Sequence, residues 1–456
     1  MLRILRPTAP RTAIRFIRFY SSDIVKNVTP SIKKEPLSPL GKHLRDSIKL
    51  TGPLTISHFM RQVLVNPLSG YYMEGDVFGK KGDFITSPEI SQVFGELCGI
   101  WYLTEWMRLG EPQKTQLIEF GPGRGTLMSD MLRTLSQFPY FYKTITDVHF
   151  VEASPGLRKM QRAALVQGSQ DNDVIRIEGN KDEPPIETIT RSDGVKVSWH
   201  DGIEVVPDQW SCIMAHEFFD ALPIHSFEVR ELIVYTGVNK TGTEWREMMI
   251  DIDETEESEH NFRIVKSPIS TAMTKTYLID KKFSTDFKDG DRVDVSPDSW
   301  GVIDRIAKYL DRNGGTGLAI DYGQDYIQGD TLRAIKDHKI IHPMCDPGTA
   351  DLSADVDFKF LKEAILKGSE GVSAYGPITQ KDFLQSLGIQ ARIETLFRSA
   401  KSSEQRKVLL DGAERLMDPE LMGRIYKVLA FAKETSDVKG EPVGFENKKF
   451  ILPVEE

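Results

Sequence analysis

Three alternating glycines lie between a short apolar segment and a stretch of helix-favouring residues. The run Gln116–Phe120 is typical of a buried strand, and a helix is predicted from Thr126 onward. Gly121, Gly123 and Gly125 therefore lie in the turn that joins the strand to the helix. Because glycine carries no side chain, the backbone of this turn can lie close to a ligand. The sequence thus predicts an α/β fold that holds a ligand against a strand-to-helix turn.

A second apolar run, Val148–Val151, ends at Glu152, one β-α-β unit further along the chain. In doubly wound α/β folds, an acid at this place accepts hydrogen bonds from the hydroxyls of a ribose. The two segments together predict a nucleoside-cofactor site at the carboxyl ends of two parallel strands.

The spacing within the turn distinguishes between nucleoside cofactors. A dinucleotide fingerprint has the spacing G-x-G-x-x-G, with the ribose acid about 20 residues later. Here the spacing is G-x-G-x-G, and Glu152 follows Gly125 by 27 positions. Glu119 precedes the turn, where its charge would repel a pyrophosphate but attract an ammonium or sulfonium group. The pattern E-x-G-x-G-x-G resembles the first motif of S-adenosylmethionine-dependent methyltransferases, in which Gly121 and Gly123 would let backbone groups reach the methionine portion. A ligand-free turn and a dinucleotide-dependent dehydrogenase are the alternatives.

The first 20 residues differ in composition from the rest of the chain. They contain five arginines, no lysine and no acid, interleaved with apolar residues. This is the signature of a mitochondrial transit peptide. Arg18–Ser22 is similar to a matrix-protease cleavage site with the cut after Tyr20. We therefore expect a transit peptide over residues 1–20 and a mature protein in the mitochondrial matrix.

Composition narrows the classes of partner. The apolar fraction of 40% is that of a globular protein, and no apolar run approaches the length of a membrane span. Without the five presequence arginines, the net charge falls from −9 to about −14. This negative charge argues against nucleic acid as a partner and is compatible with a basic peptide as one. The three cysteines lie far apart without metal-site spacing, so no metal is expected. The oligomeric state stays open.

The pattern of apolar, polar and turn-forming residues divides the chain into segments. We expect a disordered linker over 21–40, a helical cap over 41–115 and the cofactor-binding core of a mostly parallel sheet over 116–223. We expect an antiparallel insertion with a helix over 224–316, and the rest of the core with substrate-side loops and C-terminal helices over 317–456. Finer predictions are one helix over 89–108, a loop over 166–194, short strands at 227–229 and 232–235, helices over 379–433 and a last strand at 450–452.

Four acids end predicted strands: Glu119, Glu152, Asp201 and Glu217. Ligands of parallel α/β sheets bind beyond the carboxyl ends of the strands, so these acids are expected to line one crevice. Glu152 would accept hydrogen bonds from both ribose hydroxyls. Asp201, with Gly202, would accept from the adenine amino group, although an exposed Asp-Gly turn is an equally good interpretation.

The segment His216–Pro223 ends the fourth predicted strand, where methyltransferases usually place the residues that orient the acceptor. If the acceptor is an arginine, its guanidinium group is positively charged, planar and best bound by carboxylates. Glu217 and Asp220 could supply them and so act in catalysis. His216 ranks below Glu217, because a single histidine at a strand end is more often a packing residue.

Five longer motifs resemble those of a known family. They are Gly82–Glu96, Glu119–Leu127, Val151–Pro155, Glu217–Pro223 and Gly348–Phe358. Over residues 45–430 the chain is similar to the MidA-type family of mitochondrial protein arginine methyltransferases. The resemblance implies a class I methyltransferase fold and S-adenosyl-L-methionine as cofactor. It also implies a role in assembly of respiratory complex I, through symmetric dimethylation of an arginine on its large matrix-arm subunit.

Polar residues at 333–357 fit either a solvated loop or a substrate lid. We expect Asp351 from this stretch, together with Asp83 and Glu89, to contact the substrate. One position departs from the family, since His216 stands where similar proteins often carry Asn. Two further functions remain alternatives: a non-catalytic complex I assembly chaperone that keeps the cofactor fold, and a small-molecule methyltransferase.

Overall fold

The computed structural model describes residues 34, 36–67, 69–73, 85–166, 175–177, 186–234, 240–278, 287–438 and 440–452. The predicted transit peptide, most of the predicted linker and Asp83 lie outside these residues. No helix in the described ranges is long and apolar enough to cross a membrane.

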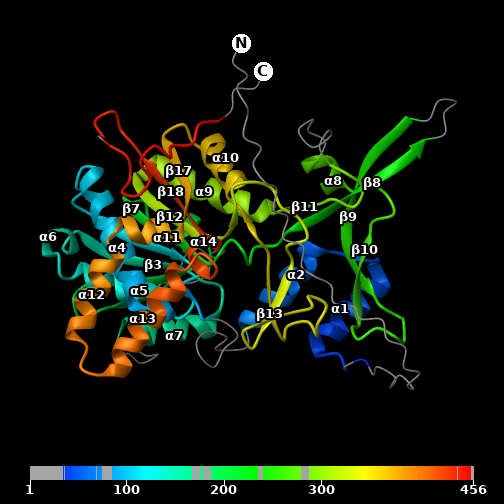
Figure 1. The fold of residues 1–456 in the computed structure, drawn as a ribbon, viewed down its shortest axis with the longest axis horizontal. Coiled ribbons are helices and arrows are strands. Elements are labelled where there is room, and N and C mark those ends of the chain that lie inside the picture. Colours follow the sequence, from blue (N-terminus) through cyan, green and yellow to red (C-terminus); the bar gives the residue numbers. More distant parts are fainter. Residues whose placement is uncertain are drawn as a thin grey trace, which may run out of the picture.

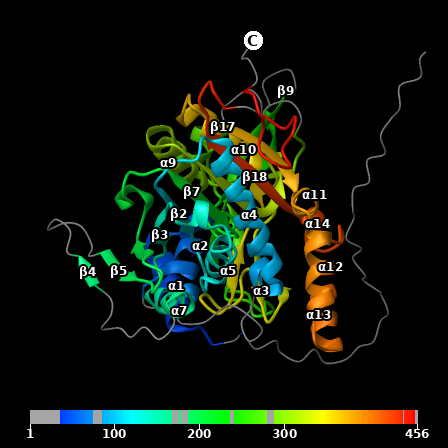
Figure 2. The same cartoon turned by 90° about the vertical axis from the view of Figure 1, so that its left-hand side faces the viewer.

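The centre of the molecule is a large, mostly parallel sheet with the order β17-β18-β12-β7-β2-β3-β6-β5-β4, and β16 pairs with β12 (Figures 1 and 2). The five strands from β12 to β6 run parallel, whereas β18 is antiparallel to both of its neighbours. The predicted α/β fold with a mostly parallel sheet is confirmed. Its strands are β2 (Thr115–Phe120), β3 (Ile145–Val151), β4 (Ile175–Ile177), β5 (Ile186–Thr190), β6 (Lys196–His200), β7 (Ser211–His216), β12 (Gly315–Gln324), β16 (Val356–Asp357), β17 (Val372–Thr379) and β18 (Tyr426–Lys433).

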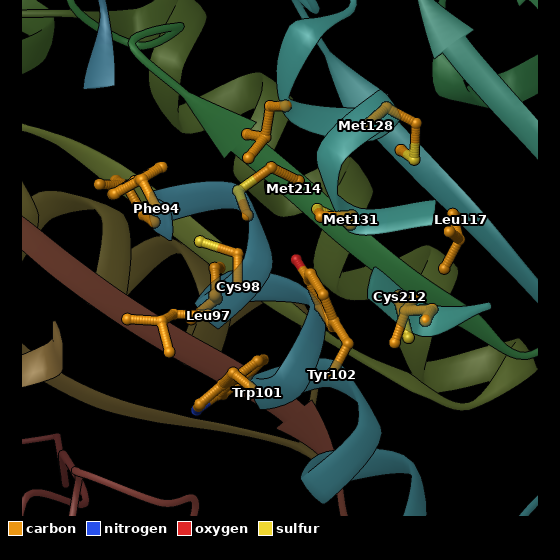
Figure 3. Packing of buried hydrophobic residues seen from close by; sticks show 14 of the residues in the cluster. Phe94, Leu97, Cys98, Trp101, Tyr102, Leu117, Met128, Met131, Cys212 and Met214 are labelled. Atoms are coloured by element: carbon orange, nitrogen blue, oxygen red, sulfur yellow. The ribbon is translucent and has the colours of Figure 1, made fainter. Parts of the chain in front are cut away.

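Helices cover both faces of this sheet. One face packs against α4 and α5, where Tyr102 and Met131 belong to one apolar cluster with Leu117 and Met214 (Figure 3). The opposite face packs against α9 and α10. Helices α12 and α13 form a pair at one side of the body (Figure 2). The helices are α3 (Ser87–Ile90), α4 (Gln92–Arg108), α5 (Thr126–Leu135), α6 (Pro139–Tyr142), α7 (Pro155–Leu165), α9 (Pro297–Asn313), α10 (Phe358–Gly368), α11 (Gln380–Ser386), α12 (Ile389–Ser399), α13 (Ser403–Met417) and α14 (Met422–Ile425), with a 3₁₀ turn at Ile203–Val205.

A second part of the molecule contains the antiparallel insertion and the N-terminal helices (Figure 1). Its apolar core joins α1 and α2 to a five-stranded sheet and to a small three-stranded sheet. The predicted helical cap is therefore divided, since α1 and α2 pack here while α4 packs on the central sheet. The elements are α1 (Pro39–Thr51), β1 (Leu54–Thr55), α2 (Ile56–Val65), η1 (Tyr71–Met73), β8 (His225–Val234), β9 (Lys240–Ile252), β10 (Phe262–Lys266), α8 (Ala272–Tyr277), β11 (Arg292–Val295), β13 (Arg333–Lys336), β14 (Lys339–Ile341) and β15 (Asp351–Ser353).

Two predictions for the N-terminal region are corrected. The linker expected over 21–40 ends early, because Leu37 is buried and the backbone N–H of Ser38 donates to Asp346 Oδ1 at 3.0 Å. The helix expected over 89–108 is broken at Ser91, whose backbone is extended at φ −156° and whose hydroxyl caps α4 by accepting from the N–H of Val93.

Pairing between distant segments explains the other differences. The loop expected over 166–194 contains β4 and β5, the two short strands near 230 are one strand, β8, and the polar stretch 333–357 forms the small sheet. Helix α9 belongs to the core and not to the insertion. The end of the predicted helical stretch is β18, which lies between β12 and β17. Residues 450–452 are described and do not form the expected strand. Next to them, an isolated bridge joins Lys449 to Tyr375.

Candidate active site

A cavity of about 210 Å³ opens beyond the carboxyl ends of β2, β3 and β7. Its walls come from the glycine turn, the end of β3, the loop after β7 and, facing them, residues of α2, η1, α3 and β15. The cavity lies where ligands bind in parallel α/β sheets. Most of the predicted site residues line it: Glu89, Glu119, Gly121, Gly123, Glu152, His216, Glu217, Asp220 and Asp351.

The glycine turn has the backbone conformation that its sequence suggested. Gly121, Gly123 and Gly125 have φ angles of 58°, 53° and 81°, in the left-handed region that favours glycine. Gly121 and Gly123 line the cavity. Gly125 does not: a Cβ atom there would lie 3.0 Å from the side chain of Leu165, so this glycine allows α5 to pack against α7. The cofactor contact of Gly125 stays a prediction, whereas its packing role is observed.

Glu119 is buried at the base of the cavity. Its Oε2 atom has no hydrogen-bond partner in the described part of the chain, and burial raises the pKa of the carboxyl well above its usual range. A buried carboxylate without a partner is costly, and a cationic ligand would remove that cost. Glu119 is therefore suited to a positively charged group in the cavity.

Glu152 lies at the end of β3 in a rigid environment. Its Oε1 accepts from the N–H of Ser154 at 2.8 Å, and its Oε2 accepts from Gln161 Nε2 at 3.1 Å. Burial raises the pKa of this carboxyl. Since a carboxylate accepts up to about four hydrogen bonds, both oxygens retain capacity for ligand hydroxyls.

Asp201 and Gly202 do not line the cavity. The side chain of Asp201 is 59% exposed and pairs with Arg158 Nη2. The same guanidinium also donates to the backbone carbonyl of Glu152. The contact of Asp201 with adenine stays a prediction, and in this arrangement Arg158 holds the carboxylate at the surface.

The loop after β7 carries two buried acids. Glu217 has a φ of +49°, and burial, reinforced by the charge of Asp220, raises its pKa to about 8. Tyr322 donates to Asp220 Oδ2, and burial raises the pKa of Asp220. One carboxyl oxygen of each acid, Glu217 Oε1 and Asp220 Oδ1, has no hydrogen-bond partner among the described residues.

Asp321, on β12 directly after the last residue paired with β7, holds this loop in place. Its Oδ2 accepts from the backbone N–H groups of Phe218, Phe219 and Asp220 at 3.2, 3.0 and 3.3 Å. The sequence analysis missed this residue, although it is an acid that directly follows the apolar run Leu318–Ile320. That position is the signal that could have identified it.

His216 and Glu89 have structural partners in the cavity wall. The ring of His216 packs against Phe94 with centroids 5.1 Å apart, and burial lowers its pKa to about 3, so it is neutral at physiological pH. Its Nε2 lies 3.6 Å from Glu217 Oε1. Glu89 closes a capping box with Thr86 on α3 and lies 3.7 Å from Arg124 Nη1. We therefore place Glu217 and Asp220 ahead of both residues as acceptor ligands.

Comparison with known proteins identifies the family. Residues 97–378 match the family model described as "Putative S-adenosyl-L-methionine-dependent methyltransferase". The chain belongs to this family. Curated relatives carry the name "Protein arginine methyltransferase NDUFAF7, mitochondrial". The Xenopus laevis protein is 38% identical over 90% of this chain and 89% of its own length, and the Homo sapiens protein is 38% identical over 87% and 84%.

Solved structures confirm the fold of this methyltransferase. A protein from Burkholderia thailandensis, crystallised with S-adenosyl-homocysteine, superposes with a TM-score of 0.69 at 22% identity, covering 92% of this chain and 99% of its own. The predicted class I methyltransferase fold and the resemblance to mitochondrial protein arginine methyltransferases are confirmed, as are S-adenosyl-L-methionine as cofactor and the mitochondrial location.

The residues of the cavity fit this cofactor. We assign Glu119 to its cationic methionine portion, Gly121 and Gly123 to close backbone contact, and Glu152 to the ribose hydroxyls. The unpartnered Glu119 oxygen and the left-handed glycines are the observations that support the fit. When bound, S-adenosyl-L-methionine supplies a methyl group on a positively charged sulfur.

Glu152→Gln should weaken cofactor binding by about 1.5–3 kcal/mol, because the neutral amide makes weaker hydrogen bonds to the ribose than a carboxylate does. Calorimetric titration with S-adenosyl-homocysteine measures the loss. Glu187→Gln, the same change on β5 outside the cavity, is the control and should bind normally. Equal affinity of the Glu152 variant and the unmodified protein would remove the ribose assignment.

Proposed function

We propose that this methyltransferase transfers methyl groups to an arginine side chain of a protein. The names of its curated relatives support this acceptor. Following the family resemblance, we propose symmetric dimethylation of an arginine on the large matrix-arm subunit of respiratory complex I. The acidic net charge of −9 is compatible with a basic segment as the acceptor.

The observation that carries the proposal is the pair of buried, unpartnered acid oxygens on one loop. Glu217 Oε1 and Asp220 Oδ1 belong to residues that line the same cavity as the glycine turn. A guanidinium group presents several N–H donors in a planar fork and stays charged at physiological pH. It would supply both the hydrogen bonds and the positive charge that these oxygens lack.

The chemistry follows from this placement. A guanidinium nitrogen forms a bond to the methyl carbon while the carbon–sulfur bond breaks, and the sulfur keeps the electron pair. The nitrogen must also lose a proton. Glu217 and Asp220 would orient the guanidinium and draw its charge away from the attacking nitrogen. Glu217, once ionised, can accept the released proton on a carboxylate oxygen.

The activity should depend on pH through Glu217. Its pKa of about 8 means that the free enzyme holds this carboxyl protonated at lower pH, where it cannot form an ion pair with a guanidinium. Because kcat/KM reports the ionisation of the free enzyme, we expect it to rise about tenfold per pH unit up to pH 8 and then to level off. Initial rates measured below KM test this. A flat profile between about pH 6 and 9 would contradict the role of Glu217.

The direct test is methyl transfer by the purified protein. The enzyme is incubated with isotopically labelled S-adenosyl-L-methionine and the unmethylated large matrix-arm subunit, and the products are analysed by mass spectrometry. We expect label on arginine as the symmetric dimethyl form. Label confined to small molecules, or label on other residue types, would overturn the proposal.

A further inference from the structure

A continuous chain of hydrogen bonds crosses the cavity from the acceptor side to the cofactor side. The hydroxyl of Tyr72 donates to Asp351 Oδ1 at 2.8 Å. The backbone carbonyl of the same tyrosine accepts from the hydroxyl of Ser154 at 2.8 Å. The N–H of Ser154 in turn donates to Glu152 Oε1 at 2.8 Å. All four residues line the cavity, so one tyrosine lies between the proposed substrate acid and the ribose acid.

The cofactor end of this chain is firmly held. Gln161, fully buried, donates from Nε2 to Glu152 Oε2 at 3.1 Å and to the carbonyl of Gly123 at 2.7 Å. Its Oε1 accepts from the indole N–H of Trp199 at 2.8 Å. Glu152 and the glycine turn are thus fixed by the same amide side chain. A displacement at Ser154 would therefore act on the residues that we assign to the cofactor.

The acceptor end of the chain depends on Tyr72. This residue lies on the short 3₁₀ turn Tyr71–Met73, so its backbone is held by fewer helical bonds than a residue of a long helix would have. Burial raises the pKa of Tyr72 well above its usual range, which keeps the hydroxyl protonated and able to donate to Asp351. Asp351 belongs to β15 of the small sheet, a different element from those that carry the cofactor residues.

We propose that Tyr72 is a positioning residue that couples the acceptor wall of the cavity to the cofactor wall. Its hydroxyl fixes Asp351, and its carbonyl fixes Ser154 and, through it, Glu152. A cofactor bound at Glu152 then stabilises the position of Asp351, and by linkage an acceptor at Asp351 favours the cofactor-binding arrangement. The acceptor half of this inference rests on the proposed function, whereas the connection between Asp351 and cofactor affinity does not.

A double-mutant cycle on cofactor binding tests the coupling. S-adenosyl-homocysteine is titrated calorimetrically into the full-length protein and into Tyr72→Phe, Asp351→Ala and the double variant. Each single change breaks the same hydrogen bond, so each should weaken binding by about tenfold. The loss in the double variant should be smaller than the product of the two single losses, because both changes break the same hydrogen bond.

The control is Tyr71→Phe, the same change on the neighbouring residue, which packs against Tyr72 without lining the cavity. It should bind S-adenosyl-homocysteine normally. Circular dichroism identifies any variant that does not fold, and if Tyr72→Phe fails to fold, Asp351→Ala still decides the question because it keeps the tyrosine and removes the acceptor.

Two results would overturn the proposal. They are normal affinity in either single variant, and a loss in the double variant equal to the product of the two single losses. Neither result bears on arginine methylation, because S-adenosyl-homocysteine binding involves no acceptor. Conversely, a failure to methylate arginine would leave the cycle unchanged.

Discussion

Glu217→Gln should reduce methyl transfer by about 10²- to 10⁴-fold, because it removes both the negative charge that binds the acceptor and the group that takes its proton. Glutamine keeps the shape of the side chain. The residue follows β7 and is assigned to the acceptor and not to the cofactor, so affinity for S-adenosyl-homocysteine should change little. Single-turnover rates and calorimetric titration of the same preparation measure the two quantities separately.

The matched control for this variant is Glu204→Gln, which makes the same change on an acid that is 57% exposed and lies outside the cavity. It should transfer methyl groups at the normal rate. Full methylation by the Glu217 variant would refute the role assigned to Glu217. Equal losses of cofactor affinity and rate would instead indicate that the side chain supports the whole cavity.

The same variant separates an enzyme from an assembly chaperone. In cells that carry only Glu217→Gln, failed complex I assembly with an unmethylated subunit would support methyl transfer as the function. Normal assembly without detectable methylation would favour the chaperone. A protein needed only for binding would tolerate the change, because the shape of the loop after β7 is kept by Asp321.

Local signals predicted the elements that carry the cofactor side of the site. Helix α5 occupies the predicted residues because Gly125, in the left-handed conformation, fixes its start. Within the predicted helical cap, helix α2 begins after Thr55, whose hydroxyl accepts from the N–H of His58, and ends before Asn66. Glu119 and Glu152 followed from the rule that strand ends meet at one edge of a parallel sheet.

The failures concern contacts between distant parts of the chain. In the sequence of β18, apolar and polar residues do not alternate, because the strand is buried between β12 and β17. An apolar run of this kind also fits a helix, which is why the segment was predicted to be helical. Asp201 follows a strand as predicted, but its carboxylate does not line the cavity. It pairs instead with Arg158, which is distant in the sequence and close only in the folded chain.

The two positioning residues that the sequence analysis missed act across long separations. Asp321 binds the N–H of Phe218 across 103 positions, and Tyr72 binds Asp351 across 279 positions. Tyr72 has no local spacing that distinguishes it from an ordinary core or surface residue, and Asp321 is marked only as an acid that follows an apolar run. Residues that bind the ligand directly are predictable from strand ends, whereas residues that hold them require the folded chain.

Gly123→Val should abolish measurable cofactor binding, which we express as a loss of at least about 100-fold. Gly123 has a φ of +53° and lines the cavity. A β-branched side chain is strained in the left-handed region by about 1–2 kcal/mol, and its methyl groups would stand where the cofactor approaches the backbone. Gly194→Val makes the same change at a φ of +89°, where an added Cβ atom has no neighbour within 4 Å. Thermal unfolding should therefore show a loss of stability in both variants, whereas S-adenosyl-homocysteine titration should show lost binding in the Gly123 variant alone. Normal binding by Gly123→Val would mean that the cofactor does not approach the backbone at this turn.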